Sequence, residues 1–338
     1  MTTLALIGCG AIAESFHLPA LKALAPKRDL SVILVDPDRE RAAALGREFG
    51  FDQTAVGHRE VLDRLDGAIL ATPHHLHVPI ALELVEAGVP VLSEKPLGVS
   101  VAEIRELRDR AAAAGVVVAV NQTRRFIPAC QEIKRILDAG ELGELVQVEM
   151  AEGDRFGWPA ATPSMFGARS GGRGVLLDIG VHALDLAVWW LGPELEVDSY
   201  RDDSFGGSEA SVRATFRQAD LTVQLRLSWL ARQANRYTFQ GTRGTLEWSI
   251  YDLDRVQIRR SSSANPEVRK IRGAPGGFAD LAPQVMENFL AAIAGETPPV
   301  VSAQGAMASM ELIEACYARR ERFSLPWHDF RMEGAHVQ

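Results

Sequence analysis

The chain has few cysteines and an odd number of them: Cys9, Cys130 and Cys316 among 338 residues. Their spacing fits neither a disulfide framework nor the closely spaced cysteine pairs of a zinc site. We therefore expect a reducing, cytoplasmic setting and no bound metal.

Long apolar runs and an excess of positive charge are also missing. No apolar run is long enough to cross a membrane, and a strand pattern begins at Leu4 without a basic leader or a cleavage site before it. Thirty-six Lys and Arg stand against 44 Asp and Glu, a net charge of -8, which argues against nucleic acid and anionic membranes as partners. We expect a small-molecule ligand instead.

The composition, 47% hydrophobic and 24% charged, is that of a globular protein, and the length fits about two domains. The first third alternates strand patterns with helix patterns. The strands are expected at residues 4–8, 31–36, 67–71, 89–94 and 116–121. The helices are expected from near Ala11, over residues 39–49 and 77–87, and from a Ser100–Glu103 capping box to Gly115. This order predicts an α/β fold, with a doubly wound parallel Rossmann sheet over residues 1–122.

After Gln122 the pattern changes to a helix, a strand, a long loop, a helix and then mostly strands, which predicts an α+β domain over residues 123–338. From Leu221 to Trp229 every odd position is apolar, as in a strand with one covered face. A partner subunit is one candidate cover, and we expect a homodimer or homotetramer. Further antiparallel strands are expected at 237–240, 245–250 and 256–260, and helices at 278–294 and 303–322. The basic stretch 255–272 predicts a solvated hairpin or, alternatively, a patch for an anionic substrate.

A glycine-containing segment, Gly8-Cys9-Gly10-Ala11-Ile12-Ala13, follows the first strand and opens a helix. In this setting backbone amides and the helix dipole hold a pyrophosphate, although a plain turn without ligand is the alternative. Asp36 ends the second strand, where a carboxylate would bind ribose hydroxyls. This favours NAD over NADP, because a 2'-phosphate would meet a like charge. Arg39 could offset such a phosphate, and Asp36 could instead cap the helix that starts at Arg39.

Two further segments supply groups for proton transfer. Lys95, in Glu94-Lys95-Pro96, ends a buried strand, where its ammonium can polarise a carbonyl or bind an alcohol; a surface lysine is the alternative. Asp178 and His182 are four residues apart in an apolar helical run, so they share a face, with Asp185 three residues further on. Such a histidine can act as general acid or base, or form only a helix-surface hydrogen bond.

Three histidines, His74, His75 and His77, follow the strand end at Thr72 and Pro73. Closely spaced loop imidazoles cannot all converge on one metal, so we interpret His77 as a helix-start residue near the dinucleotide.

Together these segments resemble the Gfo/Idh/MocA oxidoreductases, a family named for glucose-fructose oxidoreductase and inositol dehydrogenase. The matching segments are Gly8–Ala13, Asp36–Asp38, Ala71–His77, Ser93–Leu97, Asn121–Phe126 and Gly171–Asp185. The resemblance implies an N-terminal Rossmann domain and a C-terminal domain with an open, mainly antiparallel sheet that often forms the subunit interface.

The resemblance also implies residue roles. Lys95, Asp178 and His182 fall on the family's catalytic lysine, aspartate and histidine, with His182 moving the hydroxyl proton, Lys95 binding the same oxygen and Asp178 positioning substrate or tuning His182. The expected cofactor contacts are Gly8, Gly10, Ala11, Ile12, Ala13, Asp36, Arg39, Thr72, Pro73, His77, Glu94, Lys95 and Asn121. The expected substrate contacts are Lys95, Arg125, Arg155, Trp158, Asp178 and His182.

The implied activity is NAD(P)-dependent hydride transfer to or from a secondary alcohol or ketone of a sugar, sugar derivative or cyclitol. Two alternatives from the same family stay open. One is an NAD-dependent glycosidase that acts through transient oxidation at C3. The other is a non-catalytic NAD-binding regulator, although regulators tend to lose the lysine and histidine that this chain retains.

Overall fold

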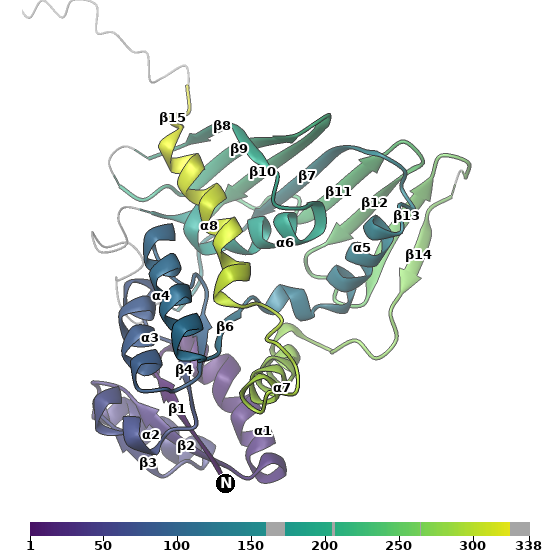
Figure 1. Ribbon diagram of the computed structural model, residues 1–338. Helices are drawn as coiled ribbons and strands as arrows, with labels where there is room; N and C mark the ends of the chain where they lie inside the picture. Colours follow the sequence, from purple (N-terminus) through teal and green to yellow (C-terminus); the bar gives the residue numbers. More distant parts are fainter. Residues whose placement is uncertain (160–172, 205–206, 264, 325–338) are drawn as a thin grey trace, which may run out of the picture.

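The computed structural model describes residues 1–159, 173–204, 207–263 and 265–324 (Figure 1). Two sheets organise these residues, one of six strands and one of nine. The matching segment that begins at Gly171 therefore lies in part outside the described residues.

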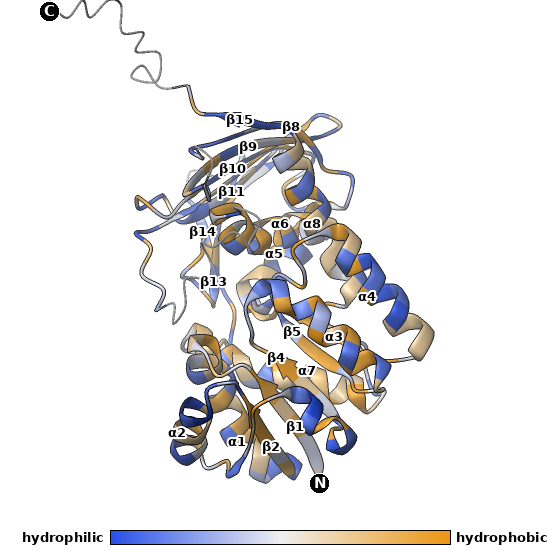
Figure 2. Cartoon of the chain, turned by 90° about the vertical axis from the view of Figure 1, so that its left-hand side faces the viewer, coloured by the Kyte–Doolittle hydropathy of each residue, from blue (hydrophilic) through white to orange (hydrophobic). Residues whose placement is uncertain are grey.

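The six-stranded sheet is parallel and has the order β3-β2-β1-β4-β5-β6. Its strands are β1 (Thr2–Ile7), β2 (Leu30–Val35), β3 (Gln53–Ala55), β4 (Gly67–Leu70), β5 (Val91–Glu94) and β6 (Val118–Asn121). The four residues of β4 and of β5 are all buried, and Figure 2 colours these strands largely as hydrophobic. The strand order reverses between β1 and β4, which is where such sheets bind ligands. The predicted Rossmann fold is confirmed.

Helices cover both faces of this sheet. They are α1 (Leu18–Arg28), α2 (Arg39–Phe49), α3 (His77–Glu86) and α4 (Val101–Ala114), and a π-helical turn, η1 (Ala13–His17), precedes α1. Ser100 accepts a hydrogen bond from the Glu103 amide at 3.2 Å, as the capping box predicts. The return contact differs, because the Glu103 carboxylate accepts from the Val99 amide rather than from that of Ser100.

The nine-stranded sheet has the order β14-β13-β12-β11-β7-β10-β9-β8-β15 and is mainly antiparallel. Its strands are β7 (Leu145–Gly153), β8 (Glu196–Asp202), β9 (Ser211–Gln218), β10 (Leu221–Ser228), β11 (Arg236–Gly241), β12 (Gly244–Ser249), β13 (Arg255–Arg260), β14 (Glu267–Lys270) and β15 (Arg320–Arg322). Parallel pairs form between β7 and β10 and between β8 and β15. The predicted helix 303–322 was too long, because α8 (Ala303–Ala318) ends before β15.

Helices of the same chain cover the apolar face of this sheet: α5 (Pro128–Asp138), α6 (Val181–Leu191) and α8, which lie in front of it in Figure 1. Trp190 of α6 packs edge-on against Tyr237, Phe239 and Trp248, with ring centroids 5.4 to 6.1 Å apart. The odd-numbered residues of β10 are buried and the even ones before Ser228 are not, as the alternation predicts. Their cover is intramolecular, so the idea that a partner subunit covers this face was wrong.

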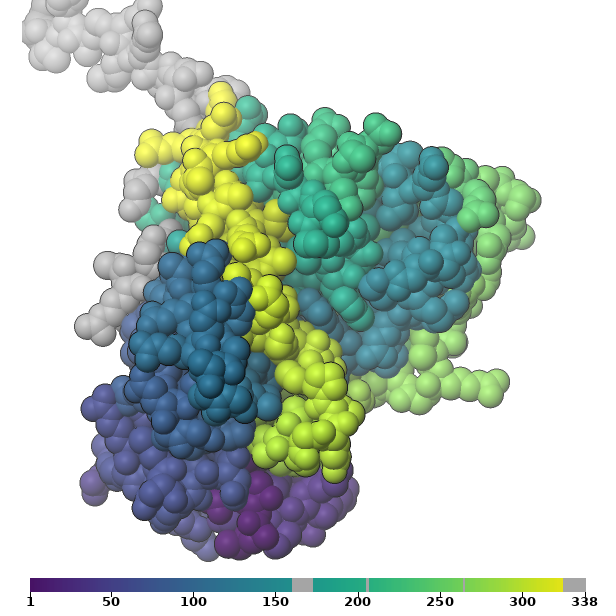
Figure 3. All heavy atoms as spheres, viewed as in Figure 1, coloured from purple at the N-terminus to yellow at the C-terminus, as the bar shows by residue number. Residues whose placement is uncertain are grey.

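The last helices return to the N-terminal half. Helix α7 (Ala282–Ile293), which the short turn η9 (Phe278–Leu281) precedes, packs on α1, and α8 packs on both α4 and α6. In Figure 3 these yellow segments lie between the purple-blue half and the green sheet. The domain division at residue 122 stays a prediction. In the described ranges, no helix combines the length and the apolar character that crossing a bilayer requires.

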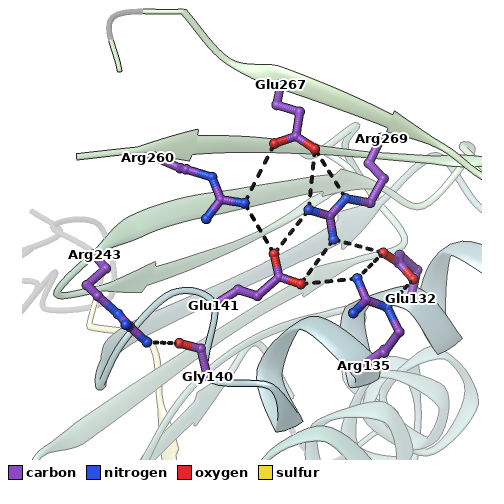
Figure 4. Close-up of polar contacts among 8 residues, drawn as sticks. All are labelled: Glu132, Arg135, Gly140, Glu141, Arg243, Arg260, Glu267 and Arg269. Carbon is purple, nitrogen blue, oxygen red and sulfur yellow. Dashed lines mark hydrogen bonds and ion pairs between the residues drawn. The ribbon is translucent and has the colours of Figure 1, made fainter. Parts of the chain in front are cut away.

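The basic stretch forms the hairpin β13–β14, and its residues Arg260 and Arg269 have carboxylate partners (Figure 4). Arg269 donates to Glu132 and Glu141 at 3.0 Å each, and Arg260 lies 3.3 Å from Glu141. Hydrogen bonds from Arg269 lower the pKa of Glu141 to about 2, against the smaller opposing effect of burial. The hairpin is therefore bound by ion pairs to Glu132 in α5 and to Glu141, which follows that helix, and this agrees with its interpretation as a hairpin rather than an anion site.

Candidate functional site

The glycine turn after β1 has room for a ligand at one glycine and no spare room at the other. Gly8 has a φ of +98°, and a Cβ built there would lie 2.5 Å from the Ala71 carbonyl oxygen. A Cβ at Gly10 would have no neighbour within 4 Å. Helical structure begins at Ala11, directly after this open position. Gly8 therefore permits close strand packing, and the space beside Gly10 fits a pyrophosphate on the amides of Ala11, Ile12 and Ala13.

Asp36 is fixed at the end of β2 by two backbone amides. One carboxylate oxygen accepts from the Cys9 amide at 2.7 Å and the other from the Asp38 amide at 2.8 Å. The N-cap of α2 is Asp38, which accepts from the Arg41 amide at 3.0 Å, so Asp36 is not the cap of this helix. Arg39 is exposed in the first turn. The Asp36 carboxylate thus borders the glycine turn, where an adenosine ribose would lie.

Beside this corner, Arg41 donates to the Cys9 carbonyl oxygen at 3.1 Å and forms an ion pair with Glu14. The sequence patterns gave no sign of this arginine. Arg41 is thus paired with Glu14 rather than with Asp36.

Lys95 and Asp178 meet at the crevice from opposite halves of the chain. Lys95 Nζ lies 2.9 Å from Asp178 Oδ1 and 3.0 Å from the Asp178 carbonyl oxygen. Burial alone would raise the pKa of Asp178, but the Lys95 charge and hydrogen bond, with help from His74 and a Trp229 hydrogen bond, lower it. An ammonium has three N–H donors, and in the described part of the chain Asp178 accepts from two of them. The third is available to a substrate oxygen.

His182 lies one turn further, in α6, after the π-helical turn η8 (Leu176–Gly180) that carries Asp178. Its Nδ1 is 3.2 Å from Oε1 of Gln122, which is 1% exposed. Burial and the nearby charges of Lys95 and Arg124 lower the pKa of His182 well below its usual value of 6.5. The sequence predicted a shared face for Asp178 and His182. In the structure, the carboxylate pairs with Lys95, and the imidazole has the Gln122 amide as its partner.

Glu94 is a buried carboxylate behind Lys95. It lies 2.8 Å from His17 Nε2 and accepts from Asn121 Nδ2 at 2.7 Å. Burial would raise the pKa of Glu94, but hydrogen bonds from His17 and Asn121 outweigh it and lower the pKa. Thr123 in turn donates to Asn121 Oδ1 at 2.7 Å. Glu94 and Asn121 thus link His17, the last residue of η1, to the ends of β5 and β6, and their cofactor contacts stay predictions.

His77 joins the loop after β4 to the loop after β5. Its two ring nitrogens lie 2.8 Å from the carbonyl oxygens of Pro96 and Thr72. His74, in the short turn η4 (His74–Leu76), lies close to Lys95 and Asp178; burial, Lys95 and His77 lower its pKa to about 3. The Thr72 hydroxyl is buried and has no partner among the described residues. This unpaired hydroxyl, next to Pro73 at the crevice end of β4, fits a contact with a cofactor.

Arg125 and Arg124, in the turn η5 (Thr123–Phe126), each bind a buried carboxylate. Arg125 forms two hydrogen bonds of 2.8 Å with Asp185 and lies 5.4 Å above the Trp189 ring. Arg124 binds Glu152 at 2.6 and 2.7 Å. Asp185 is therefore the partner of Arg125 rather than of His182, and the role of Arg125 toward substrate stays a prediction.

The loop after β7, which carries Arg155 and Trp158, reaches the site through Trp229. The Phe156 amide donates to the Trp229 carbonyl oxygen at 2.8 Å, and the two rings pack at 5.3 Å. The Trp229 indole hydrogen-bonds Asp178. Arg155 lines an open hollow with Leu230 and Arg232, and Trp158 is exposed. The roles of Arg155 and Trp158 toward substrate stay predictions.

Several residues of this arrangement were not identified from sequence, among them Gln122, His17, Trp229 and Arg41. Gln122 directly follows a buried strand, a position that could have marked it. Trp229 occupies an odd position of the β10 alternation and was therefore assigned to the core.

Comparisons with known proteins identify the family and the fold of the chain. A family model described as an oxidoreductase family with an NAD-binding Rossmann fold matches residues 2–122, and the GFO/IDH/MocA C-terminal domain matches residues 130–247. The chain is 31% identical over 193 residues to scyllo-inositol 2-dehydrogenase (NAD(+)) from Bacillus subtilis, which spans 56% of this chain and 54% of that protein. It is 35% identical over 130 residues to the rhizopine catabolism protein MocA from Rhizobium meliloti, which spans 38% of this chain and 39% of that protein. The chain thus spans about half of these curated relatives or less.

A longer alignment joins the chain to D-apiose dehydrogenase from Paraburkholderia graminis, with 27% identity over 93% of this chain and 86% of that protein. Among solved structures, levoglucosan dehydrogenase in complex with NADH and levoglucosan has a TM-score of 0.82 at 21% identity, covering 94% of this chain and 96% of that one. A 3-ketoreductase from Actinomadura kijaniata in complex with NADP and TDP-benzene also has a TM-score of 0.82, at 24% identity, covering 96% and 99%. These two structures share the fold. With both of its family models matched, the chain belongs to the GFO/IDH/MocA oxidoreductases.

Proposed function

We propose that the protein is an NAD-dependent oxidoreductase that transfers a hydride between the nicotinamide and a secondary alcohol or ketone of a sugar, sugar derivative or cyclitol. The observation that carries this proposal is the convergence of Lys95 Nζ on Asp178, with His182 one helical turn further, at the crevice end of β5. Relatives named for dehydrogenation of inositols and of D-apiose support the substrate class.

The cofactor supplies the hydride acceptor or donor when it is bound. Gly10 leaves space for its pyrophosphate, and the first-turn amides can bind the phosphates. Asp36 is held ready for ribose hydroxyls by the Cys9 and Asp38 amides. Because a 2'-phosphate would meet the Asp36 carboxylate, we propose NAD rather than NADP as the preferred cofactor.

The chain's own residues handle the proton. In the oxidation direction, Lys95 binds the hydroxyl oxygen through its third N–H, and His182 Nε2 accepts the hydroxyl proton as the hydride leaves carbon. Asp178 holds the ammonium in place. The lowered pKa of His182 keeps the imidazole neutral at ordinary pH, the form that a base requires.

The substrate pocket includes Arg155 and Trp158, which supply donors and a stacking surface suited to a polyhydroxylated ring. Arg125 supports the pocket wall through Asp185. The proposed assembly is a homodimer or homotetramer. The proposed setting is cytoplasmic, and the three free, buried cysteines are in line with such a setting.

The test is an activity panel of cyclitols, free sugars, glycosides and nucleotide-linked sugars with NAD and with NADP, read by NADH or NADPH absorbance and by chromatography of the products. Formation of NADH with a cyclitol or sugar supports the proposal. Release of free sugar from a glycoside without net NADH would identify a glycosidase instead. Tight NAD binding without turnover of any compound would identify a regulator.

A further inference from the structure

We propose that Gln122 is a positioning residue that holds His182 in the tautomer with its proton on Nδ1, so that Nε2 is the atom that accepts the substrate proton. The inference deepens the proposed function. Only its expected effects on turnover rest on that function. Its structural content concerns one hydrogen bond, between Nδ1 of His182 and the amide oxygen of Gln122, 3.2 Å apart.

The direction of this hydrogen bond follows from its atoms. An amide oxygen has lone pairs and no proton, so it can only accept. The partner Nδ1 must then carry the hydrogen, and in a neutral imidazole the other nitrogen, Nε2, is left with a free lone pair. A base needs that lone pair, and the amide oxygen therefore selects the reactive tautomer.

Gln122 is itself held in place by the backbone. The backbone N–H of Gln122 donates to the Val120 carbonyl oxygen at 2.8 Å, and the backbone carbonyl oxygen of Gln122 accepts from the backbone N–H of Arg125 at 3.0 Å. The residue follows β6, whose four residues are all buried. A side chain on such a support can fix the ring of His182 better than a residue in a mobile loop.

The side-chain amide of Gln122 is also neutral, which affects how readily His182 is protonated. A carboxylate in this position would stabilise the imidazolium, as an aspartate does in serine proteases. Here the charged groups that face His182 from other elements are Lys95, at the end of β5, and Arg124, in η5, both positive. The carboxylates on its own helical run have other partners, since Asp178 binds Lys95 and Asp185 binds Arg125. A neutral acceptor thus orients His182 without raising its affinity for protons.

The direct test is nitrogen NMR of the full-length protein with ¹⁵N-labelled histidine, saturated with NAD, with the His182 signals identified by their loss in His182→Ala. We expect a neutral imidazole protonated at Nδ1 near pH 7. A neutral imidazole protonated at Nε2 would overturn the inference, because Gln122 would then present its NH₂ group. This measurement needs no substrate, so it is independent of whether the proposed activity is found.

Two variants test the consequence. Gln122→Glu should raise the midpoint of the His182 titration and of the lower limb of turnover by about 1 to 3 pH units, with activity recovered at higher pH because a carboxylate still accepts from Nδ1. Gln122→Leu lacks an acceptor, so turnover should fall by about tenfold, the worth of one hydrogen bond, without recovery at any pH. KM should change little in either variant.

The matched control is Gln304→Glu. Gln304 is exposed at the start of α8, and its side-chain amide oxygen accepts from Arg108 of α4. It should leave both midpoints unchanged. Should Gln122→Leu fail to fold, Gln122→Glu and the wild-type NMR spectrum still decide the question. Identical pH midpoints in wild type and Gln122→Glu would contradict the inference.

Discussion

The ammonium of Lys95 is bound twice by Asp178, through Oδ1 at 2.9 Å and through the backbone oxygen at 3.0 Å. One residue of the second half of the chain thus fixes the end of a Rossmann strand. The two contacts restrict the ammonium, and in the proposed mechanism Asp178 therefore acts on the reacting oxygen through Lys95.

Asp178→Asn should therefore lower turnover by about tenfold or more while NAD affinity stays nearly constant, because the amide removes the charge that holds Lys95. Initial rates and calorimetry with NAD measure the two effects. The matched control is Asp138→Asn, which removes the exposed Lys134–Asp138 pair and should leave turnover unchanged. Full activity in Asp178→Asn would show that Lys95 needs no carboxylate partner.

The two glycines of the turn should respond differently to alanine. Gly10→Ala should keep its melting temperature, since the new methyl group meets no protein atom within 4 Å, but should lose NAD affinity by about tenfold or more as the methyl occupies the pyrophosphate space. Gly8→Ala should lose about 2 kcal/mol of stability or more, from its positive φ and the Ala71 contact. Thermal melts and calorimetry distinguish the two variants. Unchanged NAD affinity in Gly10→Ala would remove the pyrophosphate from this turn.

Cofactor choice should depend on Asp36 rather than on the neighbouring carboxylate. We expect NAD to bind at least about tenfold more tightly than NADP, and Asp36→Ser to narrow that gap by removing a like charge. Asp38→Ser is the control, because serine also caps helices and the charge it removes lies outside the ribose position. Equal affinities for the two cofactors in the unmutated protein would contradict the role of Asp36.

The pH profile and the double mutant test whether His182 and Lys95 act as a unit. The pKa of His182 is lowered, and the neutral form is the active base, so oxidation should persist as pH falls through 6.5 and be lost only well below it. Lys95→Ala and His182→Ala should each reduce turnover by about 10²-fold or more, and the double mutant should be little worse than the poorer single mutant. His182→Ala should also lose the lower limb of the profile. Additive losses would show that the two residues act independently.

The sequence was sufficient for the elements whose causes are local. The buried runs that became β1, β2, β4 and β5 were predicted as strands. The predicted ends of α2 and α4 are confirmed, and the residues that follow these helices, Gly50 and Gly115, have positive φ. Two of the strands that were not located from sequence have no apolar signal. β3 contains only Gln53, Thr54 and Ala55, and β15 is Arg-Glu-Arg, so pairing with a neighbouring strand defines them.

The sequence predicted which residues form the candidate site better than it predicted which of them form hydrogen bonds or ion pairs with one another. The glycine turn, Lys95, Asp178 and His182 have local signatures, but the partner of each depends on contacts between residues far apart in the chain. The spacing of Asp178 and His182 suggested a pair. The Asp178 carboxylate binds the ammonium of Lys95, 83 residues away in sequence, instead. A charged ammonium is a stronger partner for a carboxylate than a neutral imidazole is. The imidazole of His182 forms its hydrogen bond with Gln122, 60 residues away in sequence.

The most direct test of the central claim is NADH formation by the wild-type protein and by His182→Ala with the same cyclitol and sugar panel, the NAD affinity of both being measured in parallel. The account predicts that at least one compound gives NADH with the wild-type protein. It also predicts that the rate falls by about 10²-fold or more in His182→Ala and that NAD affinity is nearly equal in the two. If His182→Ala forms NADH at the wild-type rate with an unaltered pH profile, the helix-face histidine is structural, and the proton belongs to Lys95 or to water.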